Sequence, residues 1–354
     1  MNDNKFVKLG DVAHECRLTW SGDQTNVPVV GLEHLIPGEI KLSSWDSNIE
    51  HTFSKKFTKG QVLLGRRRVY LKKAVVAPCD GICSGDITVI ESTGKILPEL
   101  LPFVIQNDRF FDFAMQGSAG SLSPRVKWEH LKNYEFPLPT LSEQKVLADK
   151  LWAAYRLKES YKKLLAATED MVKSRFIEMF GDPIKNSKNL PSIKGEELFV
   201  FSSGKANTKA NLSKEFPYDC YGGNGITGKS EQWLIDFPTI IVGRVGEYCG
   251  CVHKTQGKIW ITDNAIFIKE YKEKVFNGEF LFYLMTYLDF HRLADETGQP
   301  KITQRPLLST EYMVPNLSLQ EQFVSIAHQA DKSGFELRKS IDAIDTVIKS
   351  LINS

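Results

Sequence analysis

The stretch "EFPLPTLSEQKVLADKL", Glu135 to Leu151, has a counterpart later in the chain, "EYMVPNLSLQEQFVSIA", Glu311 to Ala327. In both, a short β-prone run that contains proline leads through a polar turn with a Glu-Gln pair into residues typical of a helix. A chain that repeats such a junction is expected to repeat the units on either side of it.

Three further landmarks recur in the same order. The run "VLLGRRRVY" (62–70) matches "IIVGRVGEY" (240–248), and "GDITVIES" (85–92) matches "TDNAIFIKE" (262–270). These two runs recur after 178 and 177 positions, about half of the 354 residues, and Gly10 has a counterpart in Gly195 after 185, so the sequence predicts two similar units. The matched pairs are Gly10 with Gly195, Gly65 with Gly243, Asp86 with Asp263, and Glu143-Gln144 with Glu321-Gln322.

A heptad pattern follows each junction. Apolar residues from Phe323 onward alternate spacings of four and three, and the same phase, with polar interruptions, starts at Leu147. A lone amphipathic helix of such length is marginal in water, so we expect the two helices to pack antiparallel as a coiled coil. The expected seam consists of Leu147, Leu151, Tyr161, Leu165, Val172, Leu337, Ile341, Ile344 and Ile348.

Helix ends are also marked. Ser142 and Ser318 are the expected capping hydroxyls, while Gly181 is placed to adopt the left-handed conformation that ends the first helix before Pro183. As one helix, residues 141–180 would span roughly 60 Å. The alternative is that each helix belongs only to the core of its own domain.

These patterns predict an α+β protein, because short β-branched and aromatic runs alternate with turn residues and short helices in each half. We expect two similar mixed α/β domains joined by two long antiparallel helices, with pseudo-two-fold symmetry. The expected boundaries are 1–140 for the first domain, 141–181 for the central helix, 182–316 for the second domain and 317–354 for the last helix.

The charge and hydropathy of the sequence limit the classes of function that the chain can have. The formal net charge is +2, so a polyanion would have to be held by local patches of positive charge. The sequence has no apolar run long enough for a membrane span and no apolar signal segment, and we therefore expect a cytoplasmic protein without a membrane partner.

Neither catalysis nor metal binding is predicted. The six cysteines lack zinc-site spacing and are expected to be mostly buried free thiols, and the seven histidines have no evident Cys or carboxylate companions. Nucleotide-binding, amino-methyltransferase and nuclease motifs are missing from the sequence. We therefore expect a non-catalytic chain.

Local basic patches indicate contact with double-stranded DNA. In the first half, "GRRRVYLKK" (65–73) combines arginine, which suits phosphates and guanine edges, with lysine and Tyr70; a solvated surface turn is the alternative. The segment "GSAGSLSPRVK" (117–127) adds Ser118, Ser121 and Ser123. The candidates here are Arg66, Arg67, Arg68, Lys72, Lys73, Arg125 and Lys127.

The second half offers corresponding segments. A Gly-rich stretch, "YGGNGITGK" (221–229), is interpreted as a loop that lets backbone approach DNA, or equally as an ordinary hairpin. The segment "TGQPKITQRP" (297–306) supplies amide, hydroxyl and guanidinium groups. The candidates are Asn224, Lys229, Arg244, Lys301, Gln304 and Arg305.

Taken together, the pattern resembles the specificity subunit of type I restriction-modification enzymes. The resemblance covers essentially the whole chain, and its most specific motifs are "FPLPTLSEQ" (136–144), "MFGDP" (179–183), "YGGNGITG" (221–228) and "TDNAIFI" (262–268). It implies two target-recognition domains that each bind one half of a bipartite DNA sequence. It further implies that the helices set the spacer between the halves and dock two methyltransferase (modification) subunits.

The same resemblance implies that this chain binds no cofactor. S-adenosylmethionine would serve N6-adenine methylation on the modification subunits, and ATP and Mg²⁺ would serve endonuclease activity on restriction subunits, if these are present. Two alternatives stay open: the recognition half of another DNA methyltransferase or nuclease system, and a coiled-coil assembly scaffold without a role on DNA.

Overall fold

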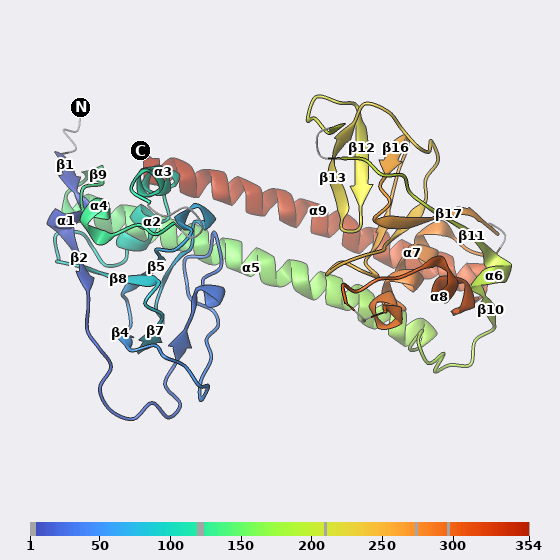
Figure 1. Ribbon diagram of the computed structural model, residues 1–354, viewed down its shortest axis with the longest axis horizontal. Coiled ribbons are helices and arrows are strands. Elements are labelled where there is room, and N and C mark those ends of the chain that lie inside the picture. The colour runs from blue at the N-terminus through green and yellow to red at the C-terminus, as the bar shows by residue number, and fades with distance from the viewer. Residues whose placement is uncertain (1–4, 119–123, 209–210, 273–274, 296–297, 354) are drawn as a thin grey trace. The chain divides into compact units, whose positions relative to one another are not determined.

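The computed structural model describes residues 5–118, 124–208, 211–272, 275–295 and 298–353 (Figure 1). They divide into two compact units: unit 1 comprises residues 1–163 and 337–354, and unit 2 comprises residues 164–336. The long helices α5 (Leu141–Phe180) and α9 (Leu317–Asn353) each contribute residues to both units. The predicted class, two mixed α/β domains joined by two long helices, is confirmed.

Unit 1 contains short strands and helices before α5. They are β1 (Lys5–Lys8), α1 (Leu9–Val12), β2 (Ala13–Cys16), β3 (Val29–Val30), η1 (Leu32–His34), β4 (Lys55–Phe57), β5 (Val62–Gly65), η2 (Val69–Leu71), β6 (Ala74–Val76), β7 (Gly81–Cys83), β8 (Ile87–Ser92), α2 (Leu101–Ile105), α3 (Asp108–Gln116), α4 (Trp128–Leu131) and β9 (Glu135–Leu138).

Unit 2 contains a corresponding series between α5 and α9. The elements are β10 (Ser192–Lys194), α6 (Gly195–Leu198), β11 (Phe199–Ser203), β12 (Tyr218–Gly222), β13 (Gly225–Ser230), β14 (Ile240–Gly243), β15 (Val252–Lys254), β16 (Ile259–Ile261), β17 (Ala265–Tyr271), α7 (Gly278–Tyr287), η4 (Phe290–Leu293), α8 (Gln304–Ser309) and β18 (Glu311–Met313).

The described strands of each unit form three sheets of matching size. Unit 1 has the pair β1-β9, the four-stranded sheet β2-β8-β5-β6 and the three-stranded sheet β3-β7-β4. Unit 2 has the pair β10-β18, the four-stranded sheet β11-β17-β14-β15 and the three-stranded sheet β13-β12-β16. The strand pair and the four-stranded sheet therefore repeat their topology, whereas the three-stranded sheets differ: the central strand is the last of the three in unit 1 (β7) and the first in unit 2 (β12).

The four-stranded sheet of each unit is covered on both faces. Along β5, Val62 and Leu64 lie in one core while Leu63 lies in another, as the period of two in a strand requires. On β14, Val242 and Ile241 divide between two cores in the same way. Burial on both faces explains why these strands have continuous apolar sequences.

In unit 1, the beginning of α5 and the end of α9 close one core. Leu151 and Tyr155 of α5 are buried in it, and Ile348 of α9 packs against it. Beyond this core, the Lys158 ammonium lies 2.6 Å from a carboxylate oxygen of Asp345. The first turns of α5 and the last turns of α9 are thus neighbours.

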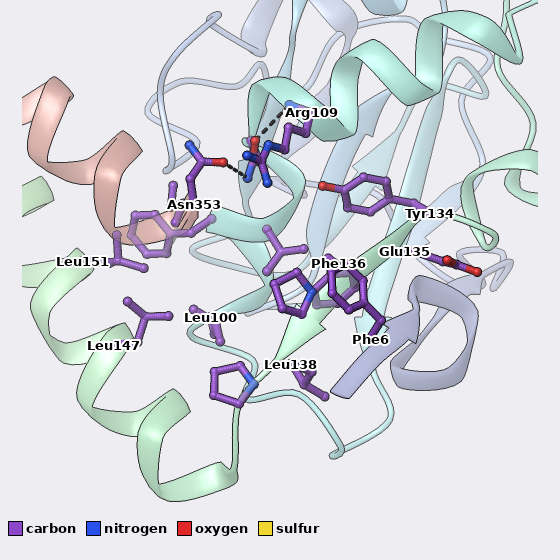
Figure 2. Close-up of a pocket in the computed structure, with 16 residues that line it drawn as sticks. Phe6, Leu100, Arg109, Tyr134, Glu135, Phe136, Leu138, Leu147, Leu151 and Asn353 are labelled. Atoms are coloured by element: carbon purple, nitrogen blue, oxygen red, sulfur yellow. Dashed lines mark hydrogen bonds between the residues drawn. The ribbon is translucent and has the colours of Figure 1, made fainter. Parts of the chain in front are cut away.

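An apolar pocket lies where these helix ends meet the rest of unit 1. Figure 2 shows Leu147 and Leu151 of α5 and Asn353 of α9 around it, together with Phe6 of β1. The side-chain amide of Asn107 donates a hydrogen bond of 3.2 Å to Asn353 Oδ1. Because the lining is mostly apolar, this pocket does not suit a polyanion.

In unit 2, the end of α5 and the beginning of α9 share a core of aromatic rings. Phe176 and Phe180 of α5 are fully buried with Phe323 of α9, and the rings of Phe176 and Phe323 meet edge to face at 5.3 Å. Ala327 of α9 is buried in the same core. Each helix is therefore a core helix in both units, and the pairing within each unit is antiparallel, as predicted.

The predicted seam residues are all buried or half-buried. That these nine side chains form one continuous seam stays a prediction. Phe176 and Phe180 were not predicted to belong to the seam. They follow Val172 at successive spacings of four, whereas a heptad pattern alternates four with three.

Both long helices start with caps other than the predicted serines. The Thr140 hydroxyl and backbone N–H donate to the Glu143 carboxylate at 2.8 and 3.0 Å, and Asn316 Oδ1 accepts from the N–H of Leu319 at 2.9 Å. The helices begin at Leu141 and Leu317, so the residues that cap them are Thr140 and Asn316. Ser142 and Ser318 already lie inside the helices. At the other end of α5, Gly181 has a φ of +80°, as predicted.

The predicted match of Gln144 with Gln322 is also wrong. Gln144 is buried, and its Oε1 accepts a 2.8 Å hydrogen bond from the N–H of Leu97. Gln320 is buried in the same way and accepts from the N–H of Asn277 at 2.8 Å. Gln320, 176 positions after Gln144, is therefore the structural counterpart.

Within the part of the chain that the structure describes, no helix combines the length and the apolar character needed to cross a membrane.

The aromatic core of unit 2 predicts a large effect of one substitution. Phe176→Ala should lower the free energy of unfolding by about 3–5 kcal/mol, because it leaves a cavity among closely packed rings. The matched control is Ile177→Ala, the next residue of α5, whose side chain is exposed. Urea unfolding followed by circular dichroism measures both; equal losses for the two variants would contradict this assignment of the core.

Candidate nucleic-acid interface

The same backbone arrangement holds the predicted arginine turn in each unit. In unit 1 the N–H of Arg66 donates to the Asp86 carbonyl at 2.9 Å, and the N–H of Val126 donates to the Arg66 carbonyl at 3.0 Å. The turn after β5 is thereby joined to the segment that contains Arg125. This brings together two predicted DNA-binding segments that lie about sixty residues apart.

Unit 2 repeats these bonds. The N–H of Arg244 donates to the Asn264 carbonyl at 2.8 Å, and the N–H of Ile302 donates to the Arg244 carbonyl at 2.8 Å. The counterpart of Asp86 is thus Asn264, one position beyond the Asp263 that the sequence match suggested. Lys301 takes the place of Arg125, since each forms an isolated bridge to the residue after the turn arginine.

A carboxylate organises the guanidinium groups of unit 1. Arg125 donates two hydrogen bonds to Asp86, at 2.7 and 3.2 Å, and Arg67 lies 3.7 Å from the same carboxylate. The hydrogen bond from Arg125, together with the positive charges of Arg125, Arg67 and Arg66, holds the pKa of the Asp86 carboxyl below its usual range. Asp86 therefore stays ionised at neutral pH and fixes the orientation of Arg125.

Arg66 faces an open groove of about 510 Å³ in unit 1. Its Nε atom is buried and has no hydrogen-bond partner among the described residues. Lys127 lines the same groove, as do Arg17 and Lys55 and the carboxylates of Glu15 and Glu129. Their positions near the groove depend on the chain fold, and no local motif marks them.

The other predicted cations of unit 1 lie in different surroundings. Arg68 is exposed and has a left-handed backbone conformation with a φ of 53°. The Lys72 ammonium lies 2.6 Å from Asp108 of α3, and the Lys73 ammonium donates to the carbonyl of Leu32 at 2.7 Å. The structure therefore does not gather Lys72 and Lys73 with the arginine–carboxylate group.

The serines predicted beside Arg125 are only partly described. Ser118 has a buried hydroxyl without a hydrogen-bond partner among the described residues. Ser121 and Ser123 lie outside the described residues.

In unit 2, the Gly-rich stretch forms the hairpin of β12 and β13, with Gly223 and Asn224 at its tip. A Cβ atom on Gly223 would lie 3.1 Å from the Asn264 carbonyl oxygen, and one on Gly243 would lie 2.4 Å from the Gly223 oxygen. Only glycine permits this close approach. The hairpin tip therefore packs against the turn of Arg244, with Asn224 exposed.

The remaining candidates of unit 2 are spread around this hairpin and α8. The Lys229 ammonium lies 3.7 Å from Asp219 of β12, and the Gln304 amide donates to the Ser203 hydroxyl at 3.3 Å. Lys301 and Arg305 are exposed. The DNA contacts of all these residues stay predictions.

The structure brings together one group of side chains that the sequence patterns did not indicate. His14 has both a cysteine and a carboxylate near it, Cys16 and Glu91. Glu91 is distant in the sequence and reaches His14 only because β2 pairs with β8, so spacing could not reveal the group.

Known proteins share this architecture. Residues 192–344 match the family model described as "Type I restriction modification DNA specificity domain". The type I restriction enzyme EcoprrI specificity subunit of Escherichia coli is 25% identical over 139 residues, which are 38% of this chain and 34% of the relative. The EcoDI specificity subunit of the same organism is 27% identical over 143 residues, 40% of this chain and 31% of the relative. The matched part spans about a third of these relatives.

Two solved structures share the fold at low sequence identity. The S subunit of a type I restriction-modification system from M. genitalium aligns with a TM-score of 0.59 at 13% identity, covering 100% of this chain and 96% of that one. A chain from a structural study of complex assembly in a type I R-M system aligns with a TM-score of 0.54 at 16% identity, covering 98% and 96%. Residues 192–344 thus match the type I specificity-domain family, and the chain is similar to type I restriction-modification specificity subunits in part of its sequence and in its fold.

Proposed function

We propose that this chain is the DNA-binding, non-catalytic subunit of a type I restriction-modification complex, and that each unit recognises one half of a bipartite target in double-stranded DNA. The observation that carries the proposal is the repeated arrangement around Arg66 and Arg244. Each unit has the same backbone arrangement, and each places an arginine at the end of a central strand. Two such copies suit a ligand that has two separate halves.

The groove beside Arg66 has the chemistry for nucleic acid. A guanidinium is a planar donor that pairs with phosphate oxygens or with the acceptors on a guanine edge. The Arg66 side chain lines this groove, and its Nε is buried without a partner among the described residues. Lys127 at the same groove supplies positive charge for the backbone phosphates, whereas Arg17 is already paired with Glu15 at 2.8 Å.

The units differ where they would meet the bases. Asp86 and Arg125 form a fixed ion pair in unit 1, whereas Asn264 and Lys301 occupy the equivalent backbone positions in unit 2. A lysine is a point charge on a flexible stem and lacks the planar fork of arginine. We infer that the two half-sites have different sequences.

The long helices are proposed to set the spacer and to bind the partner proteins. Each helix runs through both units without interruption, so its length limits how the two half-sites can be spaced. Exposed apolar side chains on them, Leu157 and Leu164 of α5 and Phe335 of α9, support docking of two methyltransferase subunits. Cofactors for methylation and cleavage are assigned to the partner subunits, including restriction subunits where these occur.

Mapping of N6-methyladenine tests the function directly. A strain that expresses the modification subunit is compared with and without this chain. We expect methylation at a two-part motif that appears only when the chain is present, because recognition resides in it. Methylation at the same motif without the chain, or none with it, would exclude the proposed role.

The spacer role makes a separate prediction. Removing one heptad from each helix, around Leu164 of α5 and Leu337 of α9, keeps the heptad phase and shortens each helix by about 11 Å. The gap in the methylated motif should shrink by about three base pairs while both half-sites stay the same. Inserting one heptad at the same points is the matched control and should lengthen the gap equally. An unchanged gap in both variants would refute the spacer role.

A further inference from the structure

Three potential metal ligands meet across one strand pair of unit 1. His14 and Cys16 lie on β2, and Glu91 lies directly opposite His14 on β8. Residues two apart on a strand point to the same face, and directly paired residues share that face, so all three side chains converge. The group lies at the edge of the four-stranded sheet, where β2 is the outer strand.

The distances within this group match those around a single zinc ion. The Cys16 sulfur lies 3.7 Å from His14 Nε2 and 3.0 Å from Glu91 Oε2, and those two atoms are 3.8 Å apart. Zinc binds sulfur at about 2.3 Å and nitrogen or oxygen at about 2.0–2.2 Å, which puts tetrahedral ligand atoms about 3.4–3.6 Å from one another. An ion can therefore be accommodated with small side-chain shifts.

A buried amide supports the group from behind. Gln61 is 5% exposed, and its Nε2 donates to the Cys16 sulfur at 3.3 Å and to Glu91 Oε2 at 3.0 Å. The amide orientation is fixed because its Oε1 accepts a 2.8 Å hydrogen bond from the N–H of Thr58. These two hydrogen bonds fix the positions of the sulfur and the carboxylate.

The group is also accessible from solvent. The side chains of His14 and Glu91 are 54% and 48% exposed, whereas Cys16 is buried beside them. An ion can thus enter from the open side, and water can complete four-coordinate geometry. Without a metal, the thiol of Cys16 donates to Glu91; on binding, the cation takes the place of this thiol proton, which leaves to solvent.

A second group of potential ligands in unit 1 lacks these properties. Glu33, His34 and Asp46 lie close together, but His34 Nδ1, the atom near Glu33, already accepts the N–H of Gly31 at 2.9 Å. Only Nε2 is left, at 3.4 Å from Asp46. One imidazole nitrogen of this group is therefore already occupied.

We propose that His14, Cys16 and Glu91 form a three-ligand site for one zinc ion, with Gln61 as the outer residue that orients the sulfur and the carboxylate. The ion would link the edge strand β2 to β8 in the sheet that also carries the Arg66 turn. The proposal is independent of DNA recognition, and its test requires no DNA.

Cobalt(II) titration of the full chain tests the site, because a cobalt–thiolate bond gives a charge-transfer absorption in the near ultraviolet. We expect saturation at one equivalent and displacement by zinc. Cys16→Ser should abolish the absorption, and His14→Gln and Glu91→Gln should each weaken binding at least tenfold. The controls are Cys79→Ser and His51→Gln in the same unit, which should bind cobalt as the unchanged chain does.

Zinc should also raise the melting temperature of the unchanged chain but not of His14→Gln, since a ligand of the folded state stabilises it by mass action. His14 is half-exposed, so its substitution leaves the core intact and keeps the test valid if Cys16→Ser fails to fold. Absence of binding at one equivalent, or a charge-transfer band that survives in Cys16→Ser, would overturn the proposal.

Discussion

The structure depends on the burial of two long helices in two different cores. An apolar stripe of this length is unstable in water, and α5 and α9 bury theirs by giving each unit one end of each helix. Neither unit has a complete core without both helices, since Leu151 and Ile348 share one core while Phe176 and Phe323 share the other. In each unit the sheets and the helix pair therefore share one core, and the loops that bear the arginines begin at strands of these sheets.

The two units share the backbone geometry around the turn arginines but differ in the neighbouring side chains. The bonds around Arg66 and Arg244 are equivalent, but the neighbouring pair is Asp86 with Arg125 in one unit and Asn264 with Lys301 in the other. The buried amides of Gln144 and Gln320 likewise fix the start of each long helix with the same bonds. A repeated backbone arrangement with different neighbouring side chains fits the proposal that the two units recognise different sequences.

Much of this fold could be predicted because its signals are local. Heptad spacing indicated both long helices, Gly181 marked the end of α5, and repeated landmarks indicated two similar units. The exact register between the two halves was predicted wrongly: Gln144 corresponds to Gln320 and not to Gln322. The helix caps were also misplaced, because the capping residues precede the predicted serines. The candidate site was also predicted only in part. The arginine turn was identifiable as a basic run. Three contacts were not: Asp86 with Arg125, Lys73 with a backbone carbonyl, and His14 with Cys16 and Glu91. They depend on strand pairing, which periodicity cannot specify.

The central claim is that two equivalent arginine turns recognise two different half-sites. Its most direct test compares the N6-methyladenine motifs produced by complexes that carry Arg66→Ala or Arg244→Ala, with Lys95→Ala as a control that removes an exposed charge elsewhere in unit 1. The account predicts that Arg66→Ala relaxes the sequence of one half-site, Arg244→Ala relaxes the other, and the control relaxes neither. Relaxation of the same half by both variants, or of neither half by both, would contradict it.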